Sequence, residues 1–177
     1  ILIYEISNIL NNIFKRNKIY SFIFLNLFII YICLFASQIY FFLSGEFENK
    51  QTIFLFILSI CILTDIGGYI FGKIFKGKKL TSVSPNKTYS GMIGSFLSSL
   101  IVSMLFVRYF NLSFHLIFFT LLISLVSQSG DLFISYLKRK AGIKDTGNFL
   151  PGHGGLLDRM DGMIFAIPIG MKLFVFF

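Results

Sequence analysis

Residues 127–162 gather nine charged side chains into one stretch of a chain that is otherwise strongly apolar. Asp131 lies inside an apolar run, where a carboxylate costs about 2.5–3.5 kcal/mol on membrane-insertion scales and therefore marks a functional-site candidate. Asp158 and Asp161, three residues apart at the start of the last apolar segment, point their carboxylates to one side of a helix. The three acids could supply the oxygen ligands that Mg²⁺ prefers, with water and substrate phosphate completing its shell.

A second interpretation of Asp158 and Asp161 is structural, because an acid near a helix start caps the helix and offsets its dipole. Arg159 between them and the His-Gly-Gly run at 153–155 favour a site instead. Glycines let backbone amides approach an anion closely, although a glycine-rich loop alone is a weak signal. We therefore expect this segment to bind a phosphate group.

Four cationic side chains, Lys138, Arg139, Lys140 and Lys144, follow the apolar run that contains Asp131. Lys and Arg pair with phosphate oxygens through charge-assisted hydrogen bonds. They are also ordinary anchors in the cytoplasmic loops of membrane proteins. The anchor role explains Lys140 better, whereas both explanations stay open for Lys138 and Arg139.

If residues 124–139 form a helix, their polar members recur at spacings of four, three, four and three and make one stripe. The rest of that helix is mainly Leu, Ile, Phe and Val, so the stripe must face the bundle interior or a water-filled cavity. An interhelical hydrogen-bond strip is the structural alternative, but a carboxylate is an expensive way to make one. The stripe consists of Ser124, Gln128, Asp131, Ser135 and Lys138.

Another acid, Asp65, lies late in a second apolar segment, within the sequence TDIGGYIFGK. Gly68 and Gly72 in this sequence form a small-residue pair suited to close helix packing. The Ser-Pro-Asn-Lys-Thr run at 84–88 then indicates a rigid turn that presents a lysine and hydroxyls at the membrane surface. A plain turn before the next helix explains this run equally well. On the next helix we assign to packing the small residues Gly91, Gly94, Ser95 and Ser98.

The composition favours one class of protein. The chain has 177 residues, of which 55% are hydrophobic and 24 are Phe, and its mean hydropathy is +0.79. A soluble domain of this size could not bury so much apolar surface. We predict a single membrane domain over residues 1–177, an all-α, polytopic integral membrane bundle with about six spans or part-spans. These are expected at 1–14, 19–43, 52–72, 90–108, 114–136 and 162–177.

Basic residues concentrate in alternate loops. The loops 15–18, 73–88 and 137–161 hold three, five and five of the 16 Lys and Arg residues. By the positive-inside rule these loops are cytoplasmic, which places every candidate site group on the cytoplasmic side. Topology, anionic lipid and nucleotide phosphate then explain the net charge of +8 better than a nucleic acid partner does, and we expect no nucleic acid partner.

With these residues in place, the chain resembles the phosphatidate cytidylyltransferase (CDP-diacylglycerol synthase) family. The family signature matches over 27 residues with fixed spacings, which is highly specific. The matching residues are Ser135, Leu137, Lys138, Arg139, Lys144, Asp145, Gly147, Leu150, Pro151, His153, Gly154, Gly155, Leu156, Asp158, Arg159, Met160 and Asp161. Three further pieces agree, namely Asp65 to Tyr69 with Gly72 and Lys73, Ser84 to Thr88 with Gly91, and Gln128 with Gly130 and Asp131.

The resemblance covers residues 60–165 and, more loosely, the whole chain. Ser90 stands where the family often has Glu, and Met160 stands where a smaller set of apolar residues is usual. Family members usually have additional N-terminal spans, and this chain begins with Ile. We therefore expect the sequence to be part of a longer protein.

The resemblance implies an integral enzyme of a bacterial inner membrane, with cytoplasmic active-site segments at 65–91 and 128–161. It implies that CTP and phosphatidate react there to give CDP-diacylglycerol and pyrophosphate. It also implies Mg²⁺ as cofactor, with a second, monovalent cation and a homodimer as further options. Neither reactant needs a protein nucleophile, so the site has to neutralise two anions and hold them in line.

Carried onto this sequence, the resemblance implies three groups of site residues. The metal ligands would be Asp65, Asp131, Asp158 and Asp161. The catalytic residues would be Lys87, Lys138, Arg139, His153 and Arg159. The substrate-binding residues would be Ser84, Thr88, Ser135, Lys144, Gly154 and Gly155.

Other functions remain as alternatives. A CTP-dependent polyprenol or dolichol kinase would use the same nucleotide but release CDP, and the full signature argues against it. A CDP-alcohol phosphotransferase would need four spaced aspartates, of which only the pair Asp158 and Asp161 is reminiscent. A transporter or structural membrane protein would leave the clustered acids unexplained, and the sequence has no visible inverted repeat.

Overall fold

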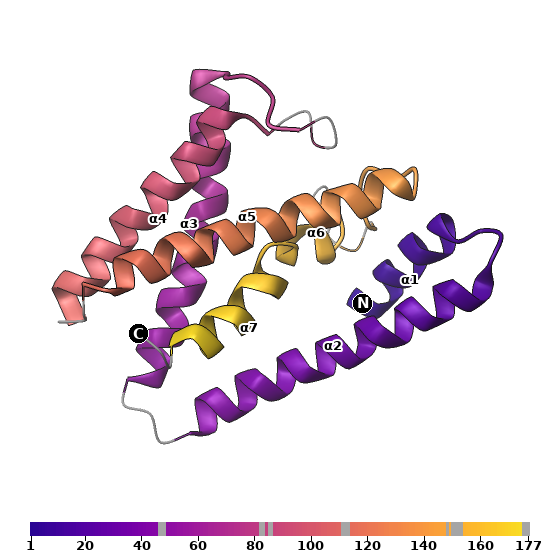
Figure 1. The fold of residues 1–177 in the computed structure, drawn as a ribbon, viewed down its shortest axis with the longest axis horizontal. Coiled ribbons are helices and arrows are strands. Elements are labelled where there is room, and N and C mark those ends of the chain that lie inside the picture. Colours follow the sequence, from indigo (N-terminus) through magenta and orange to yellow (C-terminus); the bar gives the residue numbers. More distant parts are fainter. Residues whose placement is uncertain are drawn as a thin grey trace.

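A computed structural model describes residues 1–45, 49–81, 84, 87–110, 114–147, 149 and 154–174. Over these residues the regular structure is helical, and an isolated β-bridge joins Lys79 to Thr88. This architecture confirms the predicted all-α membrane bundle. The helices, shown in Figure 1, are α1 (Leu2–Ile13), α2 (Lys18–Ser44), α3 (Lys50–Phe75), α4 (Tyr89–Phe110), α5 (Leu116–Lys140), α6 (Leu157–Met160) and α7 (Met163–Leu173).

Four of these helices, α2, α3, α4 and α5, are long and apolar enough to cross a membrane. Helices α1 and α7, expected as part-spans, have 12 and 11 residues. Pro168 lies inside α7 and has no N–H to give to the carbonyl four residues earlier. That carbonyl belongs to Ile164 and accepts a hydrogen bond of 2.7 Å from the Tyr31 hydroxyl of α2. The proline is therefore tolerated because a neighbouring helix satisfies the carbonyl that it leaves free.

Helix α5 continues four residues beyond its predicted end at 136 and finishes at Lys140. Its last turn carries three cationic side chains, which stabilise the negative end of the helix dipole. Gly142 then adopts a positive φ of 71°, and Ile143 N–H donates to the Lys138 carbonyl at 3.0 Å. This glycine-terminated end is a Schellman motif. The extension keeps Lys138 on the same helix as Asp131.

Helices α3 and α4 pack closely through small residues. The Ser95 hydroxyl donates a hydrogen bond of 2.7 Å to the Thr64 carbonyl across the interface. A Cβ on Gly94 would lie 2.3 Å from the Cβ of Phe71, so no larger residue fits there without movement. The interface confirms the packing role predicted for Gly91, Gly94, Ser95 and Ser98.

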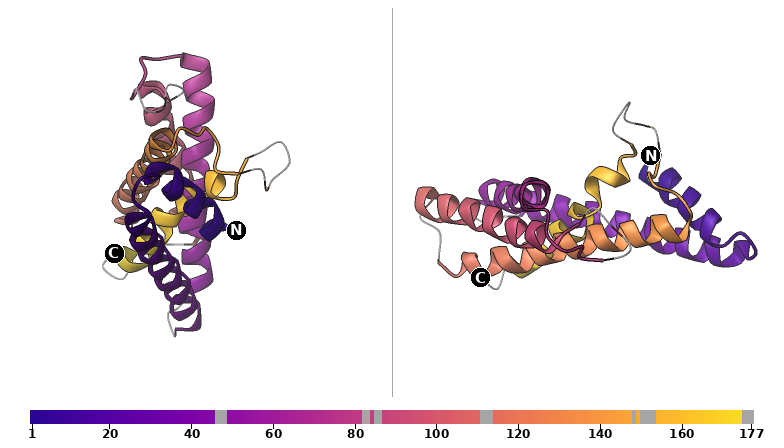
Figure 2. Two further views of the ribbon diagram at one scale, coloured as in Figure 1. Left: turned by 90° about the vertical axis from the view of Figure 1, so that its right-hand side faces the viewer. Right: turned by 90° about the horizontal axis from the view of Figure 1, so that it is seen from above.

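The core consists of two apolar clusters. One joins α3, α5 and α7 around Phe56, Phe119 and Ile167. The other joins α1, α5 and the α6 region around Ile9 and Leu157. Helix α1 buries one face in this second cluster, which holds α1 close to the C-terminal end of α5 (Figure 2).

The helix ends that adjoin the basic loops lie on one side of the bundle (Figure 1). In Figure 1 the end of α1, the ends of α3 and α5 and the starts of α2 and α4 lie toward the top and right. The opposite ends of α2, α3, α4, α5 and α7 lie toward the lower left. The first set flanks the three basic loops, so the fold gathers the positive charge on one side, as the positive-inside argument requires.

Candidate functional site

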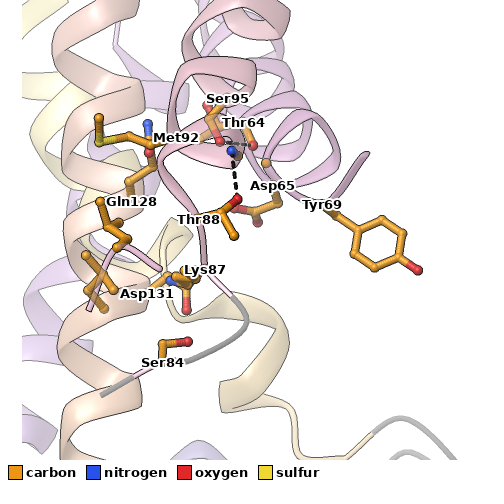
Figure 3. A pocket seen from close by; sticks show the side chains of 14 residues that line it. Thr64, Asp65, Tyr69, Ser84, Lys87, Thr88, Met92, Ser95, Gln128 and Asp131 are labelled. Atoms are coloured by element: carbon orange, nitrogen blue, oxygen red, sulfur yellow. Dashed lines mark hydrogen bonds and ion pairs between the residues drawn. The ribbon is translucent and has the colours of Figure 1, made fainter. Parts of the chain in front are cut away.

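A pocket of about 260 Å³ that contains charged and hydroxyl side chains lies between α3, α4 and the middle of α5. Its walls come from three separate parts of the chain, which meet because the close α3–α4 pair packs against α5 (Figure 3). The polar side chains that line it include Thr64, Asp65, Ser84, Lys87, Thr88, Ser95, Gln128 and Asp131. Tyr69 also borders the pocket, but its ring points away from the other labelled side chains.

The centre of the pocket is an ion pair between Lys87 and Asp131. Each of these side chains is 26% exposed, so a ligand can reach both. Lys87 is held by a short antiparallel contact before α4, in which Leu80 N–H donates to the Lys87 carbonyl at 2.7 Å. Ser84 accepts a backbone hydrogen bond from Lys87 N–H at 3.0 Å. The loop thus presents a cation to a carboxylate that α5 carries within the bundle.

Thr88 has a local structural role as well as a place in the pocket. Its hydroxyl accepts a hydrogen bond from Gly91 N–H at 3.1 Å, so it caps the start of α4. It also lies 2.9 Å from the Ser90 hydroxyl. The capping contact fixes the direction in which the chain leaves the Lys87 loop.

Two carboxyl groups meet beside the pocket. Asp161 is only 8% exposed and lies close enough to Asp131 for the charge of Asp131 to act on its carboxyl group. Burial and the negative charge of Asp131 raise the pKa of the Asp161 carboxyl. The repulsion between these acids would be relieved by a proton or by a bound cation, and a cation is the partner that their oxygen atoms suit.

Asp131 and Asp161 fit Mg²⁺ if water and substrate phosphate supply its other ligands. Within the ranges that the structure describes, no three His, Cys, Asp or Glu side chains are already arranged around one point as a metal site. Mg²⁺ usually takes only one or two carboxylates and fills its other positions with water and substrate phosphate. Asp131 and Asp161 meet that lower requirement, and Asp65 lines the same pocket.

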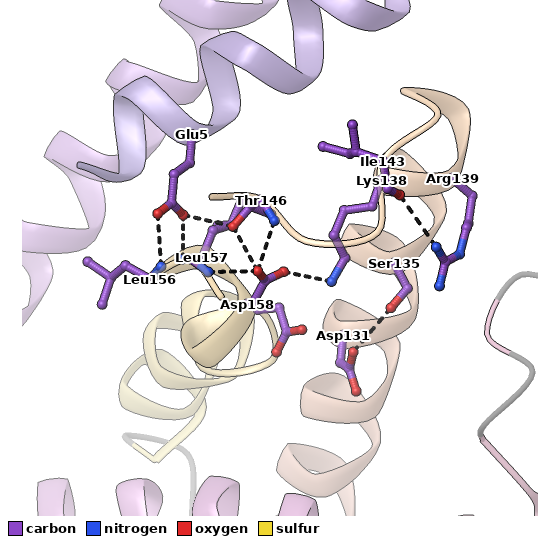
Figure 4. Close-up of polar contacts among 12 residues, drawn as sticks. Glu5, Asp131, Ser135, Lys138, Arg139, Ile143, Thr146, Leu156, Leu157 and Asp158 are labelled. Atoms are coloured by element: carbon purple, nitrogen blue, oxygen red, sulfur yellow. Dashed lines mark hydrogen bonds and ion pairs between the residues drawn. The ribbon is translucent and has the colours of Figure 1, made fainter. Parts of the chain in front are cut away.

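Asp158 lies in a second cluster, nearer the end of α5 (Figure 4). Its Oδ1 accepts a hydrogen bond of 2.8 Å from Lys138, and its Oδ2 accepts backbone N–H bonds from Thr146 at 2.9 Å and Gly155 at 3.0 Å. Burial works to raise the pKa of Asp158, but Lys138 and the two amides outweigh it and lower that pKa. Asp158 is therefore a charged, well-bonded carboxylate.

Asp158 and Asp161 both face α5, as their spacing predicts, but they meet it at different levels. Asp161 lies near Asp131, whose charge acts on it, whereas Asp158 pairs with Lys138 seven residues further along. Seven residues are about two helical turns, or roughly 10 Å. The structure thus divides the predicted metal ligands between two neighbouring clusters.

The polar stripe of α5 divides in a similar way. Gln128 donates to the Ser124 hydroxyl at 3.3 Å, and the Thr64 hydroxyl of α3 donates to Ser124 at 3.0 Å. Ser124 and Gln128 thus form the interhelical hydrogen-bond strip that was the structural alternative for the stripe. Further along, Ser135 lies 3.4 Å from Asp131 Oδ1, so it supports the acid rather than a neighbouring helix.

The remaining predicted residues lie around the second cluster. Arg139, Lys144 and Arg159 are exposed at the end of the bundle, where Arg139 donates to the Ile143 carbonyl at 3.4 Å. Gly154 has a positive φ of 83°, and a Cβ there would lie 3.0 Å from Asp158 Oδ2. Its neighbour Gly155 gives its N–H to that same oxygen. The prediction for His153 falls outside the described residues.

Sequence reasoning missed Glu5. This acid of α1 is 2% exposed and bonds to the segment around Asp158, as Figure 4 shows. Its signal in the sequence was a single acid on the apolar face formed by Ile6, Ile9 and Leu10. An acid on such a face has to find hydrogen-bond partners when the face is buried.

Comparison with known proteins identifies the family of the chain. The family model described as the cytidylyltransferase family matches residues 1–177. The phosphatidate cytidylyltransferase of Rickettsia felis is 42% identical over 140 residues, covering 72% of this chain and 60% of the relative. That of Helicobacter pylori is 41% identical over 143 residues, covering 78% of this chain and 53% of the relative.

A third relative carries the same name. The phosphatidate cytidylyltransferase of Staphylococcus haemolyticus is 47% identical over 119 residues, which cover 65% of this chain and 46% of the relative. The chain therefore spans about half the length of the curated relatives that it matches. Because the family model matches every residue of the chain, this protein belongs to the cytidylyltransferase family.

Proposed function

We propose that the full-length protein transfers the cytidylyl group of CTP to phosphatidate, which gives CDP-diacylglycerol and pyrophosphate. The observation that carries the proposal is the Lys87–Asp131 ion pair in a pocket of a largely apolar bundle. The names of the relatives supply the reactants. A lipid phosphate and a nucleotide can meet only where charged groups and bilayer-facing helices share one site.

The reaction needs no nucleophile from the protein. An oxygen of the phosphatidate phosphate forms a bond to the α-phosphorus of CTP, and the bond between the α-phosphorus and the bridging oxygen breaks. Pyrophosphate leaves with that oxygen and its electron pair. The protein contributes by bringing two anions together and by compensating the charge that develops, which positioned cations do well.

Within the pocket, the Lys87 ammonium would exchange its contact with Asp131 for a phosphate oxygen. The cationic end of α5 and the exposed Arg159 would attract the remaining phosphates. Ser84 borders the pocket and would orient the bound substrate through its hydroxyl. These assignments keep the roles that the sequence predicts and locate them on one side of the bundle.

Asp131 and Asp161 would hold Mg²⁺, with Asp65 beside them as a further ligand or as a ligand of a second cation. When bound, Mg²⁺ supplies positive charge that stabilises the phosphate oxygens of both reactants. Asp158 is a less direct candidate, because Lys138 and two backbone amides already contact its oxygen atoms. Asp158 would then act by fixing Lys138.

The orientation of the site follows from charge. The basic helix ends would face the cytoplasm, where CTP is available, and phosphatidate would approach from the surrounding bilayer. The bacterial origin of the relatives supports a bacterial inner membrane as the location of the protein. Its pocket would lie at the depth of the lipid headgroups.

The product distinguishes this function from its alternative. Full-length protein in nanodiscs would be given phosphatidate, Mg²⁺ and CTP labelled on either the α- or the γ-phosphate. The proposal predicts that the α-label enters the lipid and that the γ-label appears in pyrophosphate, only when phosphatidate is present. Transfer of the γ-label to lipid with release of CDP would instead identify a lipid kinase.

A further inference from the structure

Helix α1 places a carboxylate in the apolar core. Glu5 is 2% exposed and lies on the same helix face as Ile6, Ile9 and Leu10. A buried charge is strongly unfavourable unless hydrogen bonds or an opposite charge compensate it. The position therefore calls for specific partners, and a structural role in apolar packing alone would be served better by Leu or Met.

The partners come from the far end of the chain. Glu5 Oε1 accepts a hydrogen bond of 2.9 Å from Leu156 N–H, and Oε2 accepts one of 2.8 Å from Leu157 N–H. The Thr146 hydroxyl donates to Oε2 at 2.9 Å. Partners 141 to 152 residues away thus hold a single carboxylate, which fastens the segment around α6 to α1.

Two signature glycines make room for this carboxylate. A Cβ on Gly155 would lie 2.7 Å from Glu5 Oε2 and 2.0 Å from the Thr146 hydroxyl. A Cβ on Gly147 would lie 3.3 Å from Glu5 Oε1. These glycines are therefore needed for close approach of Glu5, which is a different use from the phosphate cradle that the sequence suggested.

Thr146 connects Glu5 to Asp158. Its hydroxyl lies 2.9 Å from Glu5 Oε2 and 3.1 Å from Asp158 Oδ2, while its backbone N–H donates to Asp158 Oδ2. A hydroxyl has one proton, so the two carboxylates share a single donor. The positions of Glu5, Thr146 and Asp158 are consequently linked, and Asp158 in turn holds Lys138.

We propose that Glu5 is a positioning residue that sets the Asp158–Lys138 pair for cytidylyl transfer. This inference rests on the proposed function for its catalytic part and on the contacts alone for its structural part. Glu5 does not line the pocket, and Gly155 is the one predicted substrate-binding residue beside it in the described structure, so it acts through Thr146 and the backbone amides of Leu156 and Leu157.

The Glu5→Gln variant changes the contacts with little change in shape. A carboxylate accepts on both oxygens, whereas an amide offers one acceptor and one NH₂ donor. The NH₂ group would face the N–H of Leu156 or of Leu157, and that amide would lose its partner. Ser21→Ala is the matched control, because the buried Ser21 hydroxyl joins α2 to Asn11 of α1 at 2.6 Å without touching the 146–158 segment.

The experiment uses the full-length protein in nanodiscs and two readouts, normalised to folded protein. Hydrogen exchange at the amides of Leu156 and Leu157 should rise about tenfold in Glu5→Gln and stay unchanged in Ser21→Ala. The kcat for CDP-lipid formation should fall about ten- to a hundredfold in Glu5→Gln, as for other outer-shell partners, with Ser21→Ala within twofold of wild type.

A double-mutant cycle separates positioning from general destabilisation. Thr146→Val removes the shared hydroxyl, so its effect on kcat should not add to that of Glu5→Gln. Should Glu5→Gln fail to fold, Thr146→Val alone should still lower kcat. The inference is overturned if Thr146→Val and a folded Glu5→Gln keep wild-type kcat, or if exchange at Leu156 and Leu157 is unchanged. A wild-type protein without transferase activity overturns the proposed function and the catalytic role of Glu5, while the exchange experiment still decides the contacts.

Discussion

Two aspartates of one site, Asp131 and Asp158, occupy opposite environments. Asp131 shares a pocket with Lys87, stays 26% exposed and has a second carboxyl group, Asp161, against it. Asp158 is enclosed by Lys138, Thr146 and Gly155, and each of its oxygens accepts a hydrogen bond. The first environment leaves charge to be compensated by a ligand, and the second compensates charge within the protein. This difference is the reason for proposing that Asp131 binds a cation and that Asp158 positions Lys138.

Asp131→Asn should have the largest effect on activity. The substitution removes a negative charge from the pocket and leaves an amide that binds Mg²⁺ weakly, so we expect kcat to fall roughly a hundred- to a thousandfold. Turnover of labelled CTP by the full-length protein would be compared with Ser129→Ala, an exposed position on the same helix whose hydroxyl bonds to the Leu125 carbonyl. Retained activity in Asp131→Asn would contradict a binding role for Asp131 and with it the proposed difference between Asp131 and Asp158.

Asp158→Asn should weaken the fold as well as the reaction. Lys138 and Asp158 have side chains only 12% and 11% exposed, and loss of one partner leaves the other without compensation. We expect a loss of about 3 kcal/mol in the free energy of unfolding. Denaturation of the protein in detergent measures this effect, and a variant as stable as the wild type would show that the pair is not structural.

The contribution of the Lys138–Asp158 pair to the stability of the fold depends on pH. Because the folded state lowers the pKa of Asp158, its ionised form stabilises the fold above the unfolded pKa of about 3.9. That contribution is lost as the pH falls through the lower pKa of the folded state. Asp158→Asn should therefore show a smaller loss of stability than wild type between pH 5 and the acid limit, roughly pH 2. Equal slopes in the two proteins would contradict the assignment.

Gly94→Leu would test the packing that shapes the pocket. A Cβ at this position already meets the Phe71 side chain at 2.3 Å, so a larger side chain must separate α3 from α4. We expect a loss of about 1–3 kcal/mol in stability and a weaker Lys87–Asp131 contact. Met104→Leu, at an exposed position on α4, is the control, and both variants would be compared by thermal unfolding. Equal midpoints would contradict close α3–α4 packing.

Tyr31→Phe should have the smallest effect. It removes only the hydroxyl that bonds to the Ile164 carbonyl beside Pro168, at a cost of about 1 kcal/mol. The hydroxyl bonds to the Ile164 carbonyl and to neither aspartate, so kcat per folded molecule should stay at the wild-type value. A large loss of activity would mean that the position of Asp161 depends on how α2 holds α7.

The sequence allowed the fold class, the order of the spans and the polar stripe of α5 to be predicted, because apolar length and helical spacing are local properties. It also predicted that Asp158 and Asp161 face one side. It could not predict that they meet α5 two turns apart, since this depends on how the segment after residue 154 runs along α5. The sequence marks Glu5 only as an acid on an apolar face, and it could not predict the partners of Glu5, because they lie more than 140 residues away.

The central claim is that the pocket around Asp131 binds the cation that the reactants need. The most direct measurement is Mn²⁺ binding to the full-length protein in nanodiscs, with CTP present, by electron paramagnetic resonance. The account predicts that Asp131→Asn weakens Mn²⁺ binding by about tenfold or more, while Ser129→Ala binds as the wild type does. Undiminished Mn²⁺ binding by a folded Asp131→Asn protein would contradict it and would move the cation to another part of the chain.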